Sequence, residues 1–528
     1  MLTHRAGTGP SQPQAPNLAR REWAAMLAAA MAMPLLPACG GGGSQGSEPG
    51  SAPTPPPPAP PQSGSGFDRY LGGLPTSAVM GAWVRTITEF GIRRAGGPAE
   101  AATIAFAESV LADMGVEVLS QPVALTRWDT REGETHVEVC VDGVCAQYPA
   151  FPTLSSRVNK WVQGDLVRYQ GGTSSLHGKV VLLDYPMGKF APGALREGSD
   201  WVYDPDSDLG STVHPSSRPQ NSSAAQTLET VLKAGPAAVI AALDDFIDTP
   251  YVYGVHSTAP YDKSIPIVWV SPSSRKAILE QLQRGEVTSR VSVVSTQSEV
   301  SSKNVIGRLP CDRTDQIVLF GSHLDAPFYG ATEDAAGVAL VLAQAAYWSR
   351  VPRAERPFEF WFLLNSAHLL GSVGCEAFVS ANTNLLPRVV LNVHLETPCQ
   401  EFNIDAAGQL IDQGRVEPHW FYTSRNTSLQ SALRDAVRAE DYRRTMMISP
   451  DAFRDGPPCD AKALWKAGVP LMAHISNPVY YTCIADTLDK LNLPSLEQLT
   501  RCVARTIWAL QGTTAAQMRA GISKTQMT

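Results

Sequence analysis

The chain has 528 residues, with 43 lysines and arginines against 50 aspartates and glutamates, and its formal net charge is −7. This balance excludes a sequence-wide basic surface of the kind that binds nucleic acid. With 44% hydrophobic and 18% charged residues, the composition is that of a globular protein and not of a disordered or fibrous one. The length allows two or more domains, or one large domain with an insertion.

The first 38 residues have the pattern of an export signal. Arg20–Arg21 precede an apolar run, Trp23–Ala38, that is too short to remain as a membrane-spanning anchor. The run leads into Leu36–Gly40, which resembles the lipobox of bacterial lipoproteins, where the signal is cleaved before a cysteine that is then lipidated. The alternative is an ordinary secretory signal with a chance cysteine. The arginine pair also leaves a twin-arginine export route open.

We therefore expect residues 1–38 to be a lipoprotein signal peptide and Cys39 to carry the lipid. Gly40 is not the aspartate that retains many lipoproteins at the inner membrane, so the outer membrane is the expected location in a Gram-negative cell. In residues 39–66, flexible glycine and serine stretches flank a stiff proline-rich centre. Such a segment cannot bury a core, and we expect it to tether a globular body to the cell envelope.

Eight cysteines follow Cys39, and an even number in an exported chain favours disulfides. Cys140 and Cys145 flank Asp142-Gly143, a turn signal of β-hairpins, so these two are expected to form a disulfide. None of the cysteines has the CxxC spacing of a zinc site, and the pairing of the other six stays open. They are Cys311, Cys375, Cys399, Cys459, Cys483 and Cys502.

The periodicity of apolar residues predicts alternating helices and strands along the rest of the chain. Helices are expected over 77–89 and 98–114, followed by a strand from residue 116. Between 155 and 295 the expected elements are strands over 179–184, 237–242 and 265–270 and helices over 223–234 and 273–284. Beyond residue 302 they are strands over 316–321, 358–364 and 388–393 and helices over 335–347, 373–380 and 496–511. This alternation predicts an α/β fold with helices on both faces of a sheet and ligands at the carboxyl ends of its strands.

Three core segments within 155–295 follow one another in the order of a known small domain. They are Gly178–Leu182, Lys233–Ile240 and Ile265–Ser271. The series resembles the protease-associated domain, an insertion found in several exported peptidases. The resemblance implies a lid or substrate-selecting role and no chemistry in the insertion itself.

Polar residues follow the strand expected over 316–321. His323 and Asp325 suit a metal site, because the imidazole can bind the ion while the carboxylate holds the ring from the second shell. Glu333, at the start of the next helix, can complete the same site. By spacing alone, however, a His-x-Asp pair is more often a hydrogen-bonded pair on the surface.

A longer series of motifs accompanies this pair. The series resembles the zinc exopeptidase family that contains the co-catalytic aminopeptidases, the glutamate carboxypeptidases and the glutaminyl cyclases, and it extends over nearly all of 75–511. The resemblance implies a three-layer αβα domain with a mixed central sheet. The motifs are Asn304–Ile306, His323–Asp325, Gly330–Gly337, Leu369–Ser372, Asn392–His394, Tyr480–Thr482 and Asp486–Lys490.

The resemblance also implies where a metal would bind. Its ligands would be His323, Glu333 and His394, and Asp325 would orient the ring of His323. Two imidazoles and one carboxylate can form a zinc site.

Other positions depart from the family pattern. Ser366 and Tyr481 stand where the family has ligands of a second metal, so we expect one zinc ion or none. Asn365 stands at the general-base position, and an amide cannot accept a proton as a carboxylate does. Glu396 and His368 are the candidates for a substitute base.

Two functions remain open. The first is an exported, lipid-anchored, zinc-dependent exopeptidase or amidohydrolase of the aminopeptidase type, which acts weakly on a peptide or small amide. The alternative is a catalytically inactive pseudo-peptidase that binds peptides or a partner at the cell surface. A serine hydrolase is disfavoured, because no Gly-x-Ser-x-Gly elbow lies between an expected strand and an expected helix. The sequence sets neither the substrate nor the oligomeric state.

The expected organisation is one enlarged domain behind a signal and a tether. Its segments are the signal peptide (1–38), the tether (39–66), the zinc-exopeptidase-like domain (67–154 and 296–515), the protease-associated-like insertion (155–295) and a tail (516–528).

Overall fold

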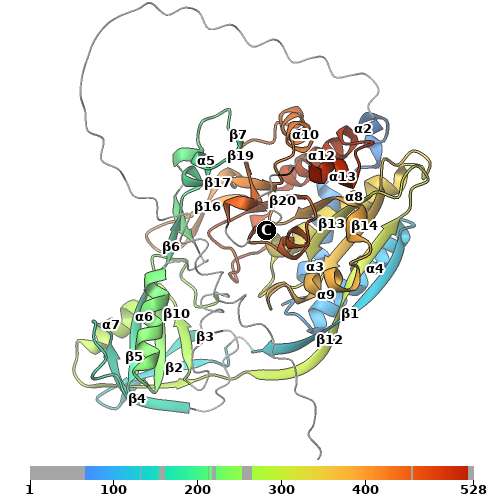
Figure 1. Cartoon of the computed structure of the whole chain (residues 1–528). Coiled ribbons are helices and arrows are strands. Elements are labelled where there is room, and N and C mark those ends of the chain that lie inside the picture. The colour runs from blue at the N-terminus through green and yellow to red at the C-terminus, as the bar shows by residue number, and fades with distance from the viewer. Residues whose placement is uncertain are drawn as a thin grey trace, which may run out of the picture.

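A computed structural model describes residues 66–130, 133–153, 161–211, 213–216, 222–252, 265–453, 456–520 and 522. The expected signal peptide and tether, including Cys39, lie outside the described residues, except for residue 66. The described part forms a large lobe of helices around a sheet and a smaller lobe built on a β-barrel (Figure 1). None of the helices described is long and apolar enough to cross a membrane.

A nine-stranded mixed sheet forms the centre of the large lobe. In spatial order its strands are β1 (Glu117–Asp129), β12 (Thr296–Leu309), β14 (Glu359–Asn365), β13 (Ile317–His323), β15 (Val389–Leu395), β20 (Leu471–Ser476), β18 (His419–Thr423), β19 (Thr445–Ile448) and β7 (Trp201–Tyr203). β13 pairs in parallel with β14 and β15, and β15 pairs in parallel with β20. These four strands are buried along their whole length and mostly apolar, as expected of parallel strands that are covered on both faces.

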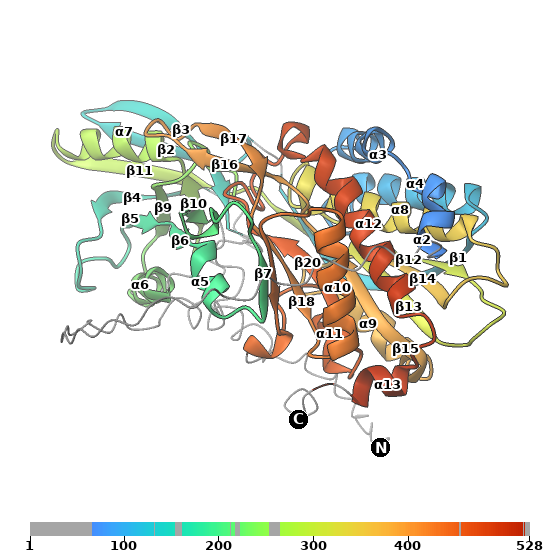
Figure 2. The ribbon, with the colours of Figure 1, turned by 90° about the horizontal axis from the view of Figure 1, so that it is seen from above.

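Helices cover both faces of this sheet and produce three layers (Figure 2). Side chains alternate along the strands, so Phe320 and Phe362 join the core under one helix layer, while Leu319 and Trp361 join the core on the other face. The first layer contains α3 (Ser77–Glu89), α4 (Pro98–Asp113), α8 (Ala336–Arg350), α10 (Thr427–Ala439) and α12 (Leu493–Ala509). The second contains α9 (Val373–Ala381) and α11 (Lys462–Lys466), and the short helices α2 (Gly66–Arg69) and α13 (Ala515–Ala520) lie near the ends of the described chain. The expected three-layer α/β fold is confirmed.

Local side chains set where several helices begin. Thr76, Asn426 and Asn492 precede α3, α10 and α12, and each accepts a hydrogen bond from a backbone N–H of the first turn. The helices expected over 77–89 and 98–114 correspond to α3 and α4.

A closed seven-stranded barrel forms the core of the smaller lobe. In order around the barrel the strands are β10 (Ile267–Val270), β3 (Val144–Pro152), β2 (His136–Val141), β11 (Val287–Ser292), β4 (Trp161–Arg168), β5 (Val180–Pro186) and β9 (Ala238–Asp244), with helices α6 (Ser222–Lys233) and α7 (Pro272–Leu282) alongside. The expected boundary at residue 155 is wrong, because β2 and β3 pair with barrel strands. A hairpin shows the same alternating pattern whichever sheet it joins, so the sequence could not assign it. The insertion begins after β1, near residue 130.

Cys140 and Cys145 face each other across the β2–β3 hairpin and form a disulfide with an S–S distance of 2.06 Å. The structure shows no disulfide for the other cysteines in the described part of the chain.

The insertion contacts the large lobe at both edges of the main sheet. At one edge, β1 and β12 pair along the full 13 residues of β1 and continue toward the barrel (Figure 1). At the opposite edge, β7, which comes from inside the insertion, pairs with β19. There Arg444 and Arg415 each bind both Asp208 of the insertion and Glu401. The buried carboxylate of Glu401 thus helps to hold the insertion in place.

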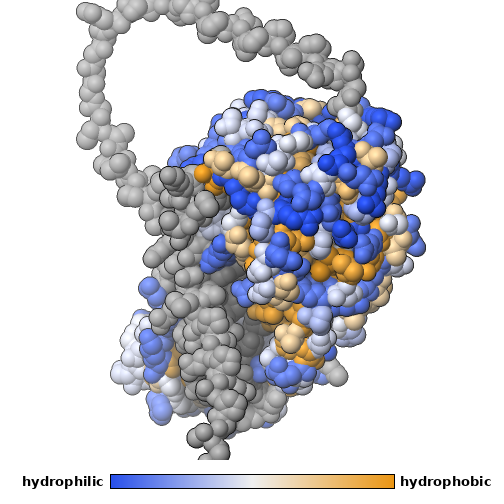
Figure 3. Space-filling model, turned by 45° about the vertical axis from the view of Figure 1, so that its right-hand side comes forward, coloured by the Kyte–Doolittle hydropathy of each residue, from blue (hydrophilic) through white to orange (hydrophobic). Residues whose placement is uncertain are grey.

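The short elements complete the described chain. They are α5 (Pro192–Glu197), β6 (Gly188–Phe190), β8 (His214–Ser216), β16 (Gln400–Ile404), β17 (Leu410–Val416), the 3-10 turns at Leu71–Gly73, Leu209–Ser211, Leu386–Arg388, Pro450–Ala452 and Leu488–Lys490, and a π-turn at Ala331–Ala335. Figure 3 shows one side of the molecule, where hydrophilic residues cover much of the upper part of the large lobe and hydrophobic patches lie below them.

Candidate metal centre

The carboxyl ends of the parallel strands bring the candidate residues to one edge of the sheet. His323 is the last residue of β13 and lies beside Asn365, the last residue of β14. His394 belongs to β15 and lies opposite Gly321, two residues before the end of β13. Glu333 comes from the π-turn that leads into α8.

Three side chains at this edge of the sheet could hold one metal ion. His323, Glu333 and His368 each offer a ligand atom within 4.8 Å of the other two, and all three side chains are buried. Nε2 of His323 lies 3.4 Å from Oε1 of Glu333. The structure therefore brings together two of the ligands expected from the sequence, and adds His368, which the sequence suggested only as a substitute base. His394 is outside this group.

The first imidazole is held by a backbone carbonyl. Nδ1 of His323 lies 2.9 Å from the carbonyl oxygen of Asp325, whereas the nearer carboxylate oxygen of Asp325 is 3.7 Å away. That carboxylate instead accepts hydrogen bonds from the backbone N–H groups of His368 (2.9 Å) and Leu369 (3.0 Å). Asp325 thus orients His323 through its main chain and supports His368 through its side chain, which differs from the role expected from the sequence.

Two neighbours hold Glu333, one at its carboxylate and one at its main chain. Tyr481 donates its hydroxyl hydrogen bond to Oε1 of Glu333 at 2.6 Å, and the backbone N–H of Glu333 donates to Asp486 at 2.9 Å. The position expected to lack a second-metal ligand is therefore filled by a tyrosine that binds the first carboxylate. Among the described residues, Oε2 of Glu333 has no hydrogen-bond partner.

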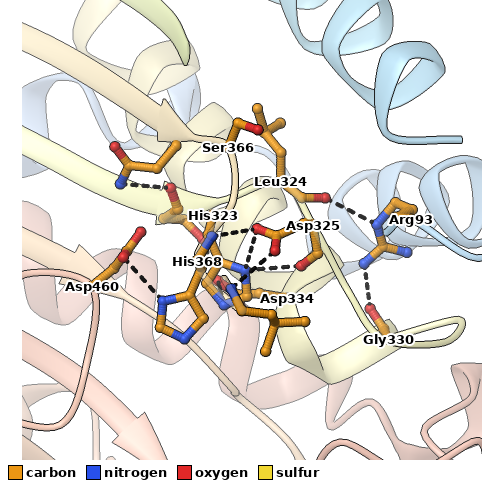
Figure 4. A network of polar contacts seen from close by, with 12 residues as sticks. Arg93, His323, Leu324, Asp325, Gly330, Asp334, Ser366, His368 and Asp460 are labelled. Atoms are coloured by element: carbon orange, nitrogen blue, oxygen red, sulfur yellow. Dashed lines mark hydrogen bonds and ion pairs between the residues drawn. The ribbon is translucent and has the colours of Figure 1, made fainter. Parts of the chain in front are cut away.

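The ring of His368 stacks on that of His323, with centroids 4.2 Å apart and planes inclined by 20°. Its Nδ1 lies 3.0 Å from a carboxylate oxygen of Asp460, and both residues are buried (Figure 4). Burial and the charge of His323 lower the pKa of His368, but the carboxylate of Asp460 outweighs them and the net shift is upward.

His394 and Glu396 form a separate buried pair. Nε2 of His394 lies 2.6 Å from Oε1 of Glu396. Burial raises the pKa of Glu396, but the charges of His394, His368 and His323 outweigh it and bring the pKa to about 2. Neither candidate for a substitute base is therefore unoccupied. Glu396 is paired with His394, whereas His368 is part of the candidate metal cluster.

Asn365, at the expected general-base position, and Ser366, at an expected second-metal position, have different surroundings. Asn365 donates a long hydrogen bond, 3.4 Å, to the carbonyl of Ser322, and its Oδ1 has no partner among the described residues. The hydroxyl of Ser366 donates to Glu100 at 2.6 Å, and Glu100 comes from the first turn of α4. A carboxylate from a distant helix thus contacts the position of a lost ligand.

A buried arginine holds the loop between His323 and Glu333. Arg93 donates from Nε to the carbonyl of Leu324 at 3.3 Å and from a terminal nitrogen to that of Gly330 at 2.8 Å (Figure 4). Burial lowers its pKa to about 10, while the nearby carboxylates act in the opposite direction, so it stays a cation at neutral pH.

Three residues near the site were not predicted from the sequence: Glu100, Arg93 and Asp460. Glu100 follows Pro98 and has the appearance of an ordinary acidic residue at a helix start. Asp460 lies in a loop without periodicity, and only the ring of His368 reveals its role. Arg93 carries no pattern of its own. A residue far away in the chain that serves a site by one contact leaves no local signal.

The donor set fits a zinc ion. Nε2 of His323 and Oε2 of Glu333 are buried and have no hydrogen-bond partner in the described part of the chain, although such atoms are seldom left unpaired. Two imidazoles with one carboxylate are typical zinc ligands, and Nδ1 of each ring already contacts an oxygen acceptor.

The comparisons with known proteins point to one fold. Residues 304–507 match the model of Peptidase family M28. The aminopeptidase from Aneurinibacillus sp. strain AM-1 is similar in structure, with 19% identity and a TM-score of 0.56 over 84% of this chain and 95% of that chain. The fold is that of the M28 aminopeptidases.

Two further structures agree. The peptidase M28 precursor from Shewanella amazonensis SB2B has 19% identity and a TM-score of 0.63 over 84% of this chain and 96% of that one. BSAP, a zinc aminopeptidase from Bacillus subtilis, has 16% identity and a TM-score of 0.57 over 82% and 95%. No curated protein matches the sequence. The M28 match agrees with the expected resemblance to zinc exopeptidases.

The raised pKa of Glu100 predicts that the stability of the folded protein depends on pH. Burial, followed by the charge of Asp325, raises its pKa from 4.5 to about 7. The folded state therefore keeps a proton that the unfolded state loses, and the folded state loses stability as the pH rises from about 4.5 to 7. Relative to the parent, Glu100→Gln should gain up to about 3 kcal/mol of unfolding free energy across this window.

Urea denaturation of both proteins between pH 5 and pH 8 measures this difference. Glu108→Gln is the control, because Glu108 lies on the same helix and its pKa is lowered, not raised. A difference between parent and Glu100→Gln that stays constant over this range would contradict the prediction.

Proposed function

We propose that the protein is a zinc hydrolase of the M28 type with a single metal ion, which cleaves a peptide or small amide bond. The observation that carries the proposal is the convergence of His323, Glu333 and His368 at the carboxyl edge of the sheet, with unpaired donor atoms facing one another. The match of residues 304–507 to a peptidase family and the zinc aminopeptidase among the similar structures support it.

The residues of the candidate centre have separate roles in this proposal. A zinc ion, when bound, would polarise the substrate carbonyl and lower the pKa of a bound water. His323 and His368 provide imidazole nitrogens, and Glu333, fixed by Tyr481, provides the carboxylate. Asn365 cannot take a proton, and loss of a positioned base costs on the order of 10²–10⁴ in rate. Weak hydrolysis is therefore expected.

Metal content tests the centre directly. Purified full-length protein should retain about one zinc ion per chain, and His323→Ala or His368→Ala should lose it, because each removes one of three ligands. His394→Ala should retain it. Elemental analysis after gel filtration measures the content, with His136→Ala on the barrel as the control variant.

The result also separates the two ligand sets. Loss of zinc in His394→Ala but not in His368→Ala would favour the set expected from the sequence. Parent protein without zinc would overturn the hydrolase proposal.

A binding function is the second candidate, because the altered positions satisfy one another. Tyr481 binds Glu333 and Ser366 binds Glu100, so the positions of the lost ligands are filled by buried hydrogen bonds. In this alternative, the protein is a pseudo-peptidase that holds a peptide or a surface partner at the same edge.

Restoring a carboxylate at residue 365 distinguishes the candidates. If the parent is a weakened hydrolase, Asn365→Glu should raise amide hydrolysis by about 100-fold or more, because a general base is restored. Asn365→Gln, with the same length but no base, should show no gain. Release of the chromophore from a panel of aminoacyl-anilides measures the rate. Absence of hydrolysis in both the parent and Asn365→Glu, together with peptide binding by the parent, would support the pseudo-peptidase.

The proposed location rests on the sequence of the first 66 residues. We infer export and lipid attachment at Cys39, with the tether between the envelope and the two lobes. Cells grown with labelled palmitate should incorporate the label into the parent and not into Cys39→Ser, because no other residue lies in a lipobox. Cys311→Ser is the control, since Cys311 is a partly exposed thiol far along the chain. Equal label in Cys39→Ser would contradict the inference.

A further inference from the structure

We propose that Asp460 is a positioning residue of the candidate centre. It fixes the Nδ1–H tautomer and the ring orientation of His368, so that Nε2 of His368 is left as the ligand atom. The inference rests on the proposed single-metal function. It adds to that function a residue that neither the family match nor the sequence motifs identify.

The main chain of His368 is fixed first. Its N–H donates to Asp325 at 2.9 Å, and its carbonyl accepts from the N–H groups of Gly371 (2.9 Å) and Ser372 (2.8 Å). The residue before it, Ala367, has a φ of +61°, which is strained for a side chain with a Cβ. A strained residue persists where surrounding contacts determine it, and such residues cluster at functional sites.

The ring of His368 then has one strong partner. Nδ1 lies 3.0 Å from Oδ1 of Asp460, whereas the hydroxyl of Ser372 is farther away, at 3.4 Å. A carboxylate can only accept, so a neutral His368 carries its proton on Nδ1. The lone pair of Nε2 remains free.

The ring of His323 is oriented in a similar way. Nδ1 of His323 faces the carbonyl oxygen of Asp325, which also only accepts, and its Nε2 has no hydrogen-bond partner among the described residues. The two stacked rings therefore both have Nε2 available. A metal-binding histidine commonly donates its other N–H to a carboxylate or carbonyl in this manner, which fixes its tautomer and orientation.

Stability alone does not explain Asp460. The side chain is completely buried, and within the described chain neither carboxylate oxygen has a hydrogen-bond partner, so the 3.0 Å ion-pair contact of Oδ1 with Nδ1 of His368 is its closest polar contact there. Burying a carboxylate is unfavourable, and a buried ion pair seldom stabilises the fold by more than this burial destabilises it. Its one close ion pair is with the ring of His368, so orientation of this ring is the role that the geometry supports.

The first experiment reads the tautomer without metal. The full-length protein is labelled with ¹⁵N-histidine, stripped of metal and studied by NMR at a pH where the imidazoles are neutral, with His368→Ala to assign the signal. We expect the Nδ1–H tautomer for His368 in the parent and loss of this preference in Asp460→Ala. An Nε2–H tautomer in the parent would overturn the proposal.

The second experiment measures zinc affinity by competition with a chromophoric chelator. Asp460→Ala should bind zinc 10–100-fold more weakly than the parent, the usual effect of removing an outer partner of a ligand, and Asp460→Glu should restore part of the affinity. Asp451→Ala is the matched control, because Asp451 lies between the same two elements, β19 and α11, and its carboxylate accepts a hydrogen bond from Ser449 instead of contacting the cluster. Its affinity should stay within about twofold of the parent. Circular dichroism confirms that each variant is folded.

The outcomes separate the two proposals. If the parent binds no zinc, the proposed function fails, and the NMR result still decides whether Asp460 sets the tautomer of His368. If the parent binds zinc and Asp460→Ala binds it equally well, the positioning role is overturned while the metal centre stands. If His368→Ala keeps the parent's affinity, His368 is not a ligand, and the proposed ligand role of its Nε2 is overturned.

Discussion

The parallel pairing of β13 with β14 and β15 is the constraint on which the site depends. Parallel strands end at the same edge of a sheet, so His323 and Asn365 lie side by side although 41 residues separate them. Helices cover both faces of these strands, and polar side chains can gather only where the strands end. The chain leaves this edge in loops, and those loops carry Glu333 and His368. The position of the candidate centre therefore follows from the topology of the sheet.

Burial then decides how the charges are held. A buried carboxylate is less costly where hydrogen-bond donors or cations surround it. Asp325 has two backbone N–H donors, and Glu333 has the hydroxyl of Tyr481. Tyr481 and Ser366 fit this pattern, because both donate to buried carboxylates from positions where the resemblance implied metal ligands. A hydrogen-bond donor has replaced part of the positive charge that a second metal would supply.

Sequence periodicity predicted the three layers and the edge at which the polar residues gather, because both follow from apolar patterns and strand order. It could not place the β2–β3 hairpin, since pairing partners are not written in an alternating pattern. It also could not rank His368 above His394. His394 lies opposite Gly321, and a Cβ on that glycine would be 2.9 Å from its Nδ1, so the ring lies back over the sheet and meets Glu396. The role of Asp460 could not be predicted either, because it depends on a contact with His368, which lies in a distant segment of the chain.

Asn365 shows how recognition and proton transfer can be separated. Its Oδ1 is buried and, in the described part of the chain, has no partner, so it is an acceptor without a donor at the end of the strand that neighbours His323. Buried acceptors are seldom left in this state, and a donor from a ligand or water would satisfy it. A carboxylate at the same place would accept a hydrogen bond from the same donor and could then take its proton. The change from carboxylate to amide thus retains the hydrogen bond and removes the transfer, which explains how one site can support either a slow hydrolase or a peptide-binding protein.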